Sequence, residues 1–115
     1  MPYLKLTTNV EIAPEQSSKL LADLSRLLAK ETGKPERYVM VEVTGGKAMF
    51  FGGSADPLAY LECKSIGLST TQAKALASSI PALLASTLSL PADRVYIEFS
   101  HCPAEFWGWN GSTFG

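Results

Sequence analysis

The chain has 115 residues and a net charge of −1, with 46% hydrophobic and 18% charged residues. This balance is typical of one globular domain, spanning residues 1–115, and excludes a disordered chain. The sequence has no basic stripe, which argues against a nucleic-acid partner.

The first half of the chain predicts a strand, a helix and a second strand. Residues 2–7 have the bulky apolar character of a strand, and Pro14 stands where a first helical residue is tolerated. Gly33 is a suitable helix stop, and residues 38–43 have strand-like composition. Residues 49–51 are expected to form a further short strand. The helix between these points carries one apolar stripe, made by Leu20, Leu21, Leu24, Leu27 and Leu28.

The second half repeats this order. Residues 58–66 predict a strand, and Ser69, Thr70 or Thr71 can cap the helix that follows. Pro81 lies inside that helix and is expected to kink it, because proline removes a helical hydrogen bond. Residues 95–99 predict the closing strand. The apolar stripe of the second helix consists of Ala73, Leu76, Ile80, Leu83, Leu84 and Leu88.

The two helix-to-strand joins resemble each other, at 34–39 and at 90–95. Each has a proline, a short acidic turn, an arginine and then a strand. We therefore expect an α+β fold made of a duplicated β-α-β unit, with a four-stranded mixed sheet and both helices on one face. The other face and the edges of this sheet stay uncovered, which favours a closed homo-oligomer.

The start of the chain is a candidate site. Aminopeptidases normally remove a Met that precedes proline, so the mature chain would begin with the secondary amine of Pro2. An apolar pocket and a nearby cation both lower the pKa of such an amine, and the neutral form can act as a base. Lys34 is a candidate for that cation. On its own, Lys34 is better explained by its favourable position at a helix C-terminus.

Two further regions carry unusual side chains. Tyr96, Glu98 and Ser100 share one face of the last strand, opposite the apolar Val95, Ile97 and Phe99, so the polar set points outward. The tail carries three large aromatic residues among its last nine, which indicates an apolar pocket or an interface. Within the tail, residues 110–111 (Asn-Gly) predict a tight turn.

Other chemistry has little support in the sequence. His101 is the only histidine, and Cys63 and Cys102 lie far apart, so we expect no metal site, no cofactor and no disulfide framework. The apolar residues 73–90 contain four serines and a proline, which indicates a buried helix rather than a membrane span. No signal peptide is visible. The expected location is the cytoplasm, with secretion lacking a signal peptide as the alternative.

Seven sequence blocks together resemble the macrophage migration inhibitory factor family of the tautomerase superfamily. They run in order from one end of the chain to the other, at the spacing of that family. The blocks are Met1-Pro2, Thr8-Asn9-Val10, Thr32-Gly33-Lys34-Pro35, Phe51-Gly52-Gly53-Ser54, Ser65-Ile66-Gly67, Asp93-Arg94-Val95-Tyr96-Ile97 and Gly108-Trp109-Asn110 with Ser112-Thr113-Phe114.

The resemblance implies a homotrimer with active sites between subunits, in which Pro2 is the base of a cofactor-independent keto–enol tautomerase. The implied substrates are aromatic α-keto acids such as phenylpyruvate, and dopachrome-like compounds. Lys34 and the Ile66 backbone match positions that hold the substrate carboxylate, and Tyr96 matches a pocket residue from a neighbouring subunit. The aromatic walls match Tyr38, Trp109 and Phe114.

The chain departs from the family pattern at three places. Glu98 replaces an asparagine of the vertebrate members beside the pocket. A carboxylate there would repel an anionic substrate and raise the pKa of Pro2, unless it pairs with a cation, in which case it would do neither. Trp107 is bulkier than the usual aliphatic residue, which predicts a narrower or more aromatic pocket. Leu58 and Leu61 replace the two cysteines of the vertebrate CxxC, so thiol oxidoreductase activity is not supported.

Two other functions compete with the tautomerase hypothesis. One is a cytokine-like binding protein with vestigial tautomerase activity, which Glu98 keeps open and which would act on a receptor. The other is the dehalogenase or hydratase chemistry of the superfamily, which needs extra arginine or acidic residues near the terminal proline. None of the three arginines is clearly placed for that role: Arg26, Arg37 and Arg94.

Overall fold

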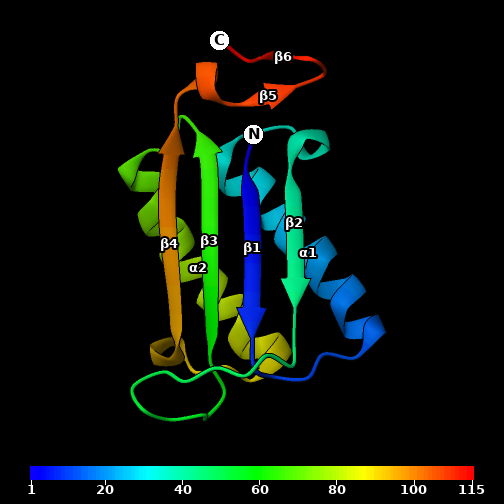
Figure 1. Cartoon of the computed structure of the whole chain (residues 1–115), viewed down its shortest axis with the longest axis vertical. Helices are drawn as coiled ribbons and strands as arrows, with labels where there is room; N and C mark the ends of the chain where they lie inside the picture. Colours follow the sequence, from blue (N-terminus) through cyan, green and yellow to red (C-terminus); the bar gives the residue numbers. More distant parts are fainter.

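The computed structural model describes residues 1–115 as a two-layer α+β fold, with two helices packed on one face of a four-stranded sheet (Figure 1). The sheet order is β2-β1-β3-β4, and a separate two-stranded sheet lies near the C-terminus. The main elements are β1 (Tyr3–Thr8), α1 (Pro14–Thr32), β2 (Met40–Thr44), β3 (Ala59–Ile66), α2 (Thr70–Leu88), β4 (Val95–Cys102), β5 (Gly108–Trp109) and β6 (Ser112–Thr113).

The sheet topology confirms the predicted duplication. β1 pairs in parallel with β2 across α1, and β3 pairs in parallel with β4 across α2. The two units meet at the antiparallel pair of β1 and β3, where Tyr3 faces Lys64 and Thr7 faces Tyr60. Corresponding points of the two units therefore lie at opposite ends of the sheet.

The repeated joins form the same local structure. Glu36–Tyr38 and Ala92–Arg94 are both single 3₁₀ turns that follow a proline. In each turn the third residue donates its N–H to the carbonyl of that proline, at 3.0 Å. The second strand of the first unit therefore begins at Met40, two residues later than predicted.

Both helices begin where the sequence predicts, and α1 also ends at its predicted stop. α1 begins at Pro14, where the missing N–H costs nothing, and ends at Gly33, whose φ of 70° is left-handed. Ser69 caps α2 by accepting the Gln72 N–H at 3.1 Å. α2 continues unbroken through Pro81, whose side chain is buried.

The core lies between the helices and the sheet. Alternate residues of β1 and β3, such as Leu4, Leu6 and Leu61, are fully buried against the helix stripes. The helices contribute the buried Leu20, Leu24, Leu28, Leu76, Ile80 and Leu84. Full burial of a leucine is worth roughly 1.5–3 kcal/mol, so these positions hold the two layers together.

The predicted strand at 49–51 was wrong. Only an isolated bridge forms there, between Phe51 and Ser54. The segment between β2 and β3 is a loop without a neighbouring strand to pair with, so composition alone does not make it a strand.

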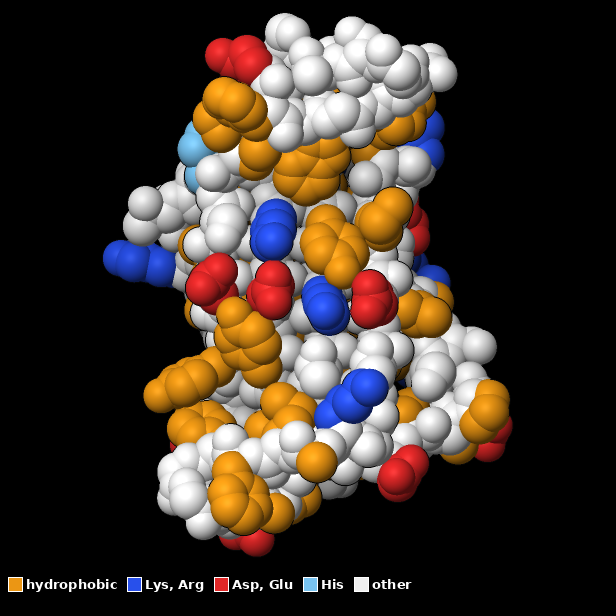
Figure 2. All heavy atoms as spheres, viewed as in Figure 1, with side chains coloured by type: hydrophobic (Ala, Val, Ile, Leu, Met, Phe, Trp, Pro, Cys, Tyr) orange, Lys and Arg blue, Asp and Glu red, His pale blue; other side chains and the backbone are white.

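The opposite face of the sheet has no covering layer within the chain. Figure 2 shows this face, with acidic and basic side chains across its middle and hydrophobic side chains above and below them. The strand register places Glu42, Lys5, Glu62 and Glu98 in one row across the four strands. Neither α1 nor α2 combines the length and apolarity needed to cross a membrane.

Candidate active site

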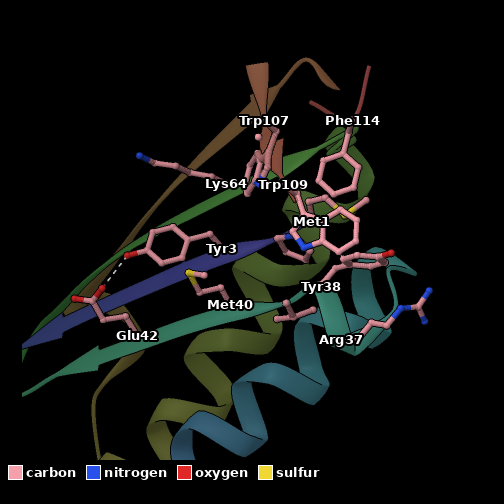
Figure 3. A pocket seen from close by; sticks show the side chains of 13 residues that line it. Met1, Tyr3, Arg37, Tyr38, Met40, Glu42, Lys64, Trp107, Trp109 and Phe114 are labelled. Atoms are coloured by element: carbon pink, nitrogen blue, oxygen red, sulfur yellow. Dashed lines mark hydrogen bonds between the residues drawn. The ribbon is translucent and has the colours of Figure 1, made fainter. Parts of the chain in front are cut away.

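A hollow of about 550 Å³ lies at the end of the sheet where the chain begins. Its lining comes from the first residues, from the turn before β2, and from the C-terminal hairpin (Figure 3). The main lining residues are Met1, Pro2, Tyr3, Tyr38, Met40, Lys64, Trp107, Trp109 and Phe114. This size and aromatic character suit a small organic ligand.

Pro2 directly precedes the central strand β1 and is itself buried. It lines the hollow. Its carbonyl accepts the N–H of Met40 at 3.0 Å, just before β1 and β2 begin their regular pairing. This bond fixes the residue at the end of a central strand, as the sequence predicted, rather than on a loose tail.

The terminal amine of Met1 has a pKa lowered from its ordinary value of 8.0. Partial burial is the larger cause, and the positive charge of Lys34 is the second. Both effects disfavour the protonated amine, so this end of the sheet favours a neutral nitrogen.

Three aromatic rings form one wall of the hollow. Tyr38 meets Trp109 and Phe114 edge-on, at centroid distances of 5.4 and 6.0 Å, and Trp109 stacks on Phe114 at 5.8 Å. The stack depends on the predicted turn at Asn110-Gly111, where both residues have positive φ and β5 returns as β6. Figure 3 shows Met1 beside these rings.

Polar side chains lie around the hollow. The Tyr3 hydroxyl donates to Glu42 at 3.0 Å, and this carboxylate is a cause of the raised pKa of Tyr3, after loss of hydration. The Lys64 Nζ lies 3.4 Å from Glu62. Arg37 stacks over Tyr38, with its Cζ 4.8 Å from the ring centroid, and its guanidinium points away from Met1 (Figure 3).

The structure brings together five of the nine residues singled out in the sequence: Pro2, Tyr38, Trp107, Trp109 and Phe114 all line the hollow. Lys34 does not line it, although its charge acts on the terminal amine. Ile66 ends β3, two residues beyond the Lys64 that faces Tyr3, and also lies outside the lining.

Tyr96 and Glu98 lie far from Pro2 of the same chain. Tyr96 is level with Tyr60 and Thr7 across the sheet, five residues along β1 from Pro2. That separation is roughly 17 Å at the usual strand rise. Tyr96 is 64% exposed and lines a different, shallow hollow with Phe50 and Phe51.

Glu98 belongs to the charged row of the open sheet face. It is paired in register with Glu62, and Ser100 donates to it at 3.5 Å. Its negative charge raises the pKa of Tyr60, after the larger effect of lost hydration. Within one chain, Glu98 therefore acts on the middle of the sheet and not on the terminal amine.

Sequence reasoning missed several lining residues, chiefly Tyr3, Met40, Glu42 and Lys64. Strand alternation places these side chains on the outward face. Their meeting beside Pro2 depends on the register between β1 and its two neighbours, which one strand's pattern does not contain.

The remaining reactive side chains lie elsewhere. His101 is exposed near the end of β4, where its Nδ1 accepts the Gly67 N–H at 3.1 Å. Cys63 and Cys102 are free, and burial raises the pKa of the Cys63 thiol to about 11. No three His, Cys, Asp or Glu side chains gather as a metal site would require.

These features define a class of small α+β proteins: a duplicated β-α-β unit whose N-terminal residues line an aromatic pocket at the end of the sheet. The profile of the family "Macrophage migration inhibitory factor (MIF)" matches residues 1–115. The chain belongs to this family.

Individual relatives align with this chain over nearly its whole length. The chain is 44% identical to the macrophage migration inhibitory factor homolog of Brugia malayi, with 100% of both chains covered. It is 39% identical to the factor of Xenopus tropicalis, with 99% of each covered. The crystal structure of the homologue from Prochlorococcus marinus is 39% identical and superposes with a TM-score of 0.93, covering 98% of this chain and 99% of that one.

Proposed function

We propose that the protein is a cofactor-independent keto–enol tautomerase in which Pro2, freed by removal of Met1, is the general base. One observation carries this proposal: the start of the chain lies in an aromatic pocket where the terminal amine has a lowered pKa. Removal of Met1 transfers the free amine to Pro2, which is the more buried of the two residues.

The reaction needs only one proton carrier. In enolisation the neutral Pro2 nitrogen removes a proton from the carbon next to the substrate carbonyl, and the protonated amine delivers a proton to the carbonyl oxygen. Ketonisation is the reverse: the nitrogen takes the enol hydroxyl proton and the protonated amine delivers one to the carbon. A base near neutral pKa suits this exchange because it must both accept and release the proton.

The pocket favours an aromatic α-keto acid such as phenylpyruvate. The rings of Tyr38, Trp109 and Phe114 offer an apolar wall for the aromatic part of the substrate. Lys34 supplies positive charge near the amine, which would attract the substrate carboxylate while keeping Pro2 neutral. Ile66, at the same end of the sheet, would add a backbone contact to that carboxylate.

We further propose that the active form is a homotrimer whose sites lie between subunits. The uncovered sheet face and edges support assembly, and the position of Tyr96 supports sharing. Because Tyr96 lies about five residues along the sheet from its own Pro2, it can reach a Pro2 pocket only in a neighbouring copy.

The direct test is Pro2→Ala, assayed by ketonisation of phenylpyruvate after intact mass has shown that Met1 is removed. Alanine leaves a primary amine without the ring, and we expect kcat/KM to fall at least about 100-fold, the usual contribution of a general base. A circular dichroism spectrum matching the unmodified protein would show that the fold persists. Activity equal to wild type, or retention of Met1 in the active protein, would overturn the proposal.

A second candidate function is a cytokine-like protein that binds a receptor through its surface. The names of the relatives support it, as do the exposed aromatic side chains Phe50 and Phe106. This function predicts receptor binding that Pro2→Ala leaves unchanged, together with negligible turnover of phenylpyruvate by the unmodified protein.

A further inference from the structure

The guanidinium of Arg94 holds the loop between β2 and β3 in place. It donates to four backbone carbonyls, with Nη1 on Phe51 at 2.7 Å, Nη2 on Ser54 at 3.1 Å and Asp56 at 2.9 Å, and Nε on Pro57 at 3.4 Å. No carboxylate lies within ion-pair distance of this arginine. Its hydrogen-bonding capacity is therefore directed at the backbone of one loop.

The same guanidinium also contacts a ring of that loop. The Arg94 Cζ lies 5.0 Å from the Phe51 ring centroid, within cation–π distance. Phe51 in turn packs on Tyr96, with centroids 4.5 Å apart and planes inclined at 38°. A continuous series of contacts therefore runs from Arg94 through Phe51 to Tyr96.

This series matters because Tyr96 is largely exposed and meets a single aromatic ring. Its ring is 64% exposed, on the outward face of β4. Phe51 is the one aromatic ring stacked against it. The orientation in which Tyr96 is presented thus depends on where Arg94 holds Phe51.

Arginine is needed for this arrangement. Its planar group offers five donors in fixed directions, which allows one side chain to reach several carbonyls and also lie over a ring. A lysine keeps the charge but has a compact ammonium with no flat face, so it cannot satisfy the same set of acceptors. Arg37, at the corresponding position of the first unit, stacks over Tyr38 without such a set of carbonyl bonds.

We infer that Arg94 is a positioning residue that sets the ring of Tyr96, through Phe51, for the active site of a neighbouring subunit. This inference rests on the proposed function, which places Tyr96 at that site. Arg94 itself touches no substrate. Its effect on turnover passes through Tyr96 and should vanish when the Tyr96 ring is absent.

A double-mutant cycle with phenylpyruvate tests this dependence. Arg94→Lys is expected to raise KM about tenfold in the unmodified protein and less than about twofold in a Tyr96→Ala background, as coupled residues require. Phe51→Leu, which leaves the loop carbonyls bound to Arg94, should behave in the same way. The matched control is Arg26→Lys, at an exposed arginine of α1 paired with Asp23, which should change KM in neither background. Equal increases in both backgrounds would overturn the inference.

A second measurement does not depend on turnover. The ring resonances of Tyr96 can be assigned by their loss in Tyr96→Phe, and Arg94→Lys should shift them in the absence of substrate while Arg26→Lys does not. Unchanged Tyr96 resonances in Arg94→Lys would overturn the inference even in an active enzyme. If the unmodified protein shows no turnover but Arg94→Lys still shifts these resonances, the proposed function fails and the Arg94–Phe51–Tyr96 contact is supported.

Discussion

Pro2 is held in place by backbone hydrogen bonding and not by a flexible side chain. The Met40 N–H donates to the Pro2 carbonyl, which holds Pro2 directly before the first residue of the central strand β1. At the adjoining Met1 amine, burial and the charge of Lys34 both lower the pKa, each disfavouring the protonated form. In the proposed mechanism, the site at this scale is one nitrogen together with the groups that favour its neutral form.

The role of Lys34 predicts a shift in the pH dependence of catalysis. Only the neutral amine accepts a proton, so kcat/KM falls as pH drops below the pKa of Pro2. The lysine charge lowers the pKa of the Met1 amine, and we expect it to act in the same direction on the Pro2 amine once Met1 is removed. Lys34→Met should therefore raise the pKa of Pro2 and move the acid limb of the profile to higher pH. The pH-independent value of kcat/KM should also fall about tenfold if Lys34 holds the substrate carboxylate through a charge-assisted hydrogen bond.

The control for this prediction is Lys30→Met, an exposed lysine in the last turn of α1. It removes the same charge a few residues away and should leave the acid limb in place. The measurement is kcat/KM for phenylpyruvate across pH at constant ionic strength. An acid limb that stays fixed in Lys34→Met would show that this lysine does not tune the base.

Among the elements, the C-terminal hairpin contributes side chains to the pocket and none to the buried core. β5 and β6 pair only with each other, and no residue after Leu90 is fully buried. The Trp109 ring nevertheless lines the hollow and packs on Tyr38 and Phe114. The hairpin therefore serves mainly as a wall for whatever the pocket binds.

We expect Trp109→Ala to impair substrate binding more than stability. Loss of one aromatic wall should raise KM for phenylpyruvate about tenfold, because aromatic contacts are worth roughly 0.5–1.5 kcal/mol beyond their area. The free energy of unfolding should fall by less than about 1 kcal/mol, since the ring is 54% exposed. Steady-state kinetics and urea denaturation measure the two effects separately.

Phe106→Ala is the matched control, because Phe106 is an aromatic residue of the same tail that does not line the hollow. It should change neither KM nor stability appreciably. An equal rise in KM for the two variants would mean that the tail acts on the pocket in a general way and not through the Trp109 ring.

Most helices and strands could be predicted from the sequence, whereas contacts between distant strands could not. The helices, the four main strands and the duplication follow from apolar periodicity and repeated joins, which are local properties of the chain. The predicted strand at 49–51 failed because strand composition needs a partner strand, and the Phe51 carbonyl bonds to Arg94 instead. The grouping of Met40, Glu42 and Lys64 beside Pro2 follows from register, which no single segment encodes.

At the scale of the whole molecule, the antiparallel meeting of the two units separates features that duplication made alike. The first join, with Arg37 and Tyr38, lies beside Pro2, and the second, with Arg94, lies at the far end of the sheet beside Tyr96. One chain therefore carries the amine at one end and a supported tyrosine at the other. A trimer in which the far end of one copy meets the amine end of the next would combine them.

This arrangement predicts complementation between two impaired variants. Pro2→Ala lacks the base and Tyr96→Ala lacks the neighbour's ring, so each homotrimer should be poorly active. A site that joins Pro2 of one copy to Tyr96 of the next is intact in about a quarter of the sites of randomly mixed trimers, because each position is native with even odds. Mixing by co-denaturation and refolding should therefore restore roughly a quarter of the wild-type kcat per site.

Native mass spectrometry would verify three chains per particle and the presence of mixed species, and refolded single variants serve as controls. If mixed trimers form but activity equals the average of the two parents, no site combines Pro2 of one copy with Tyr96 of another, and the shared-site proposal is wrong.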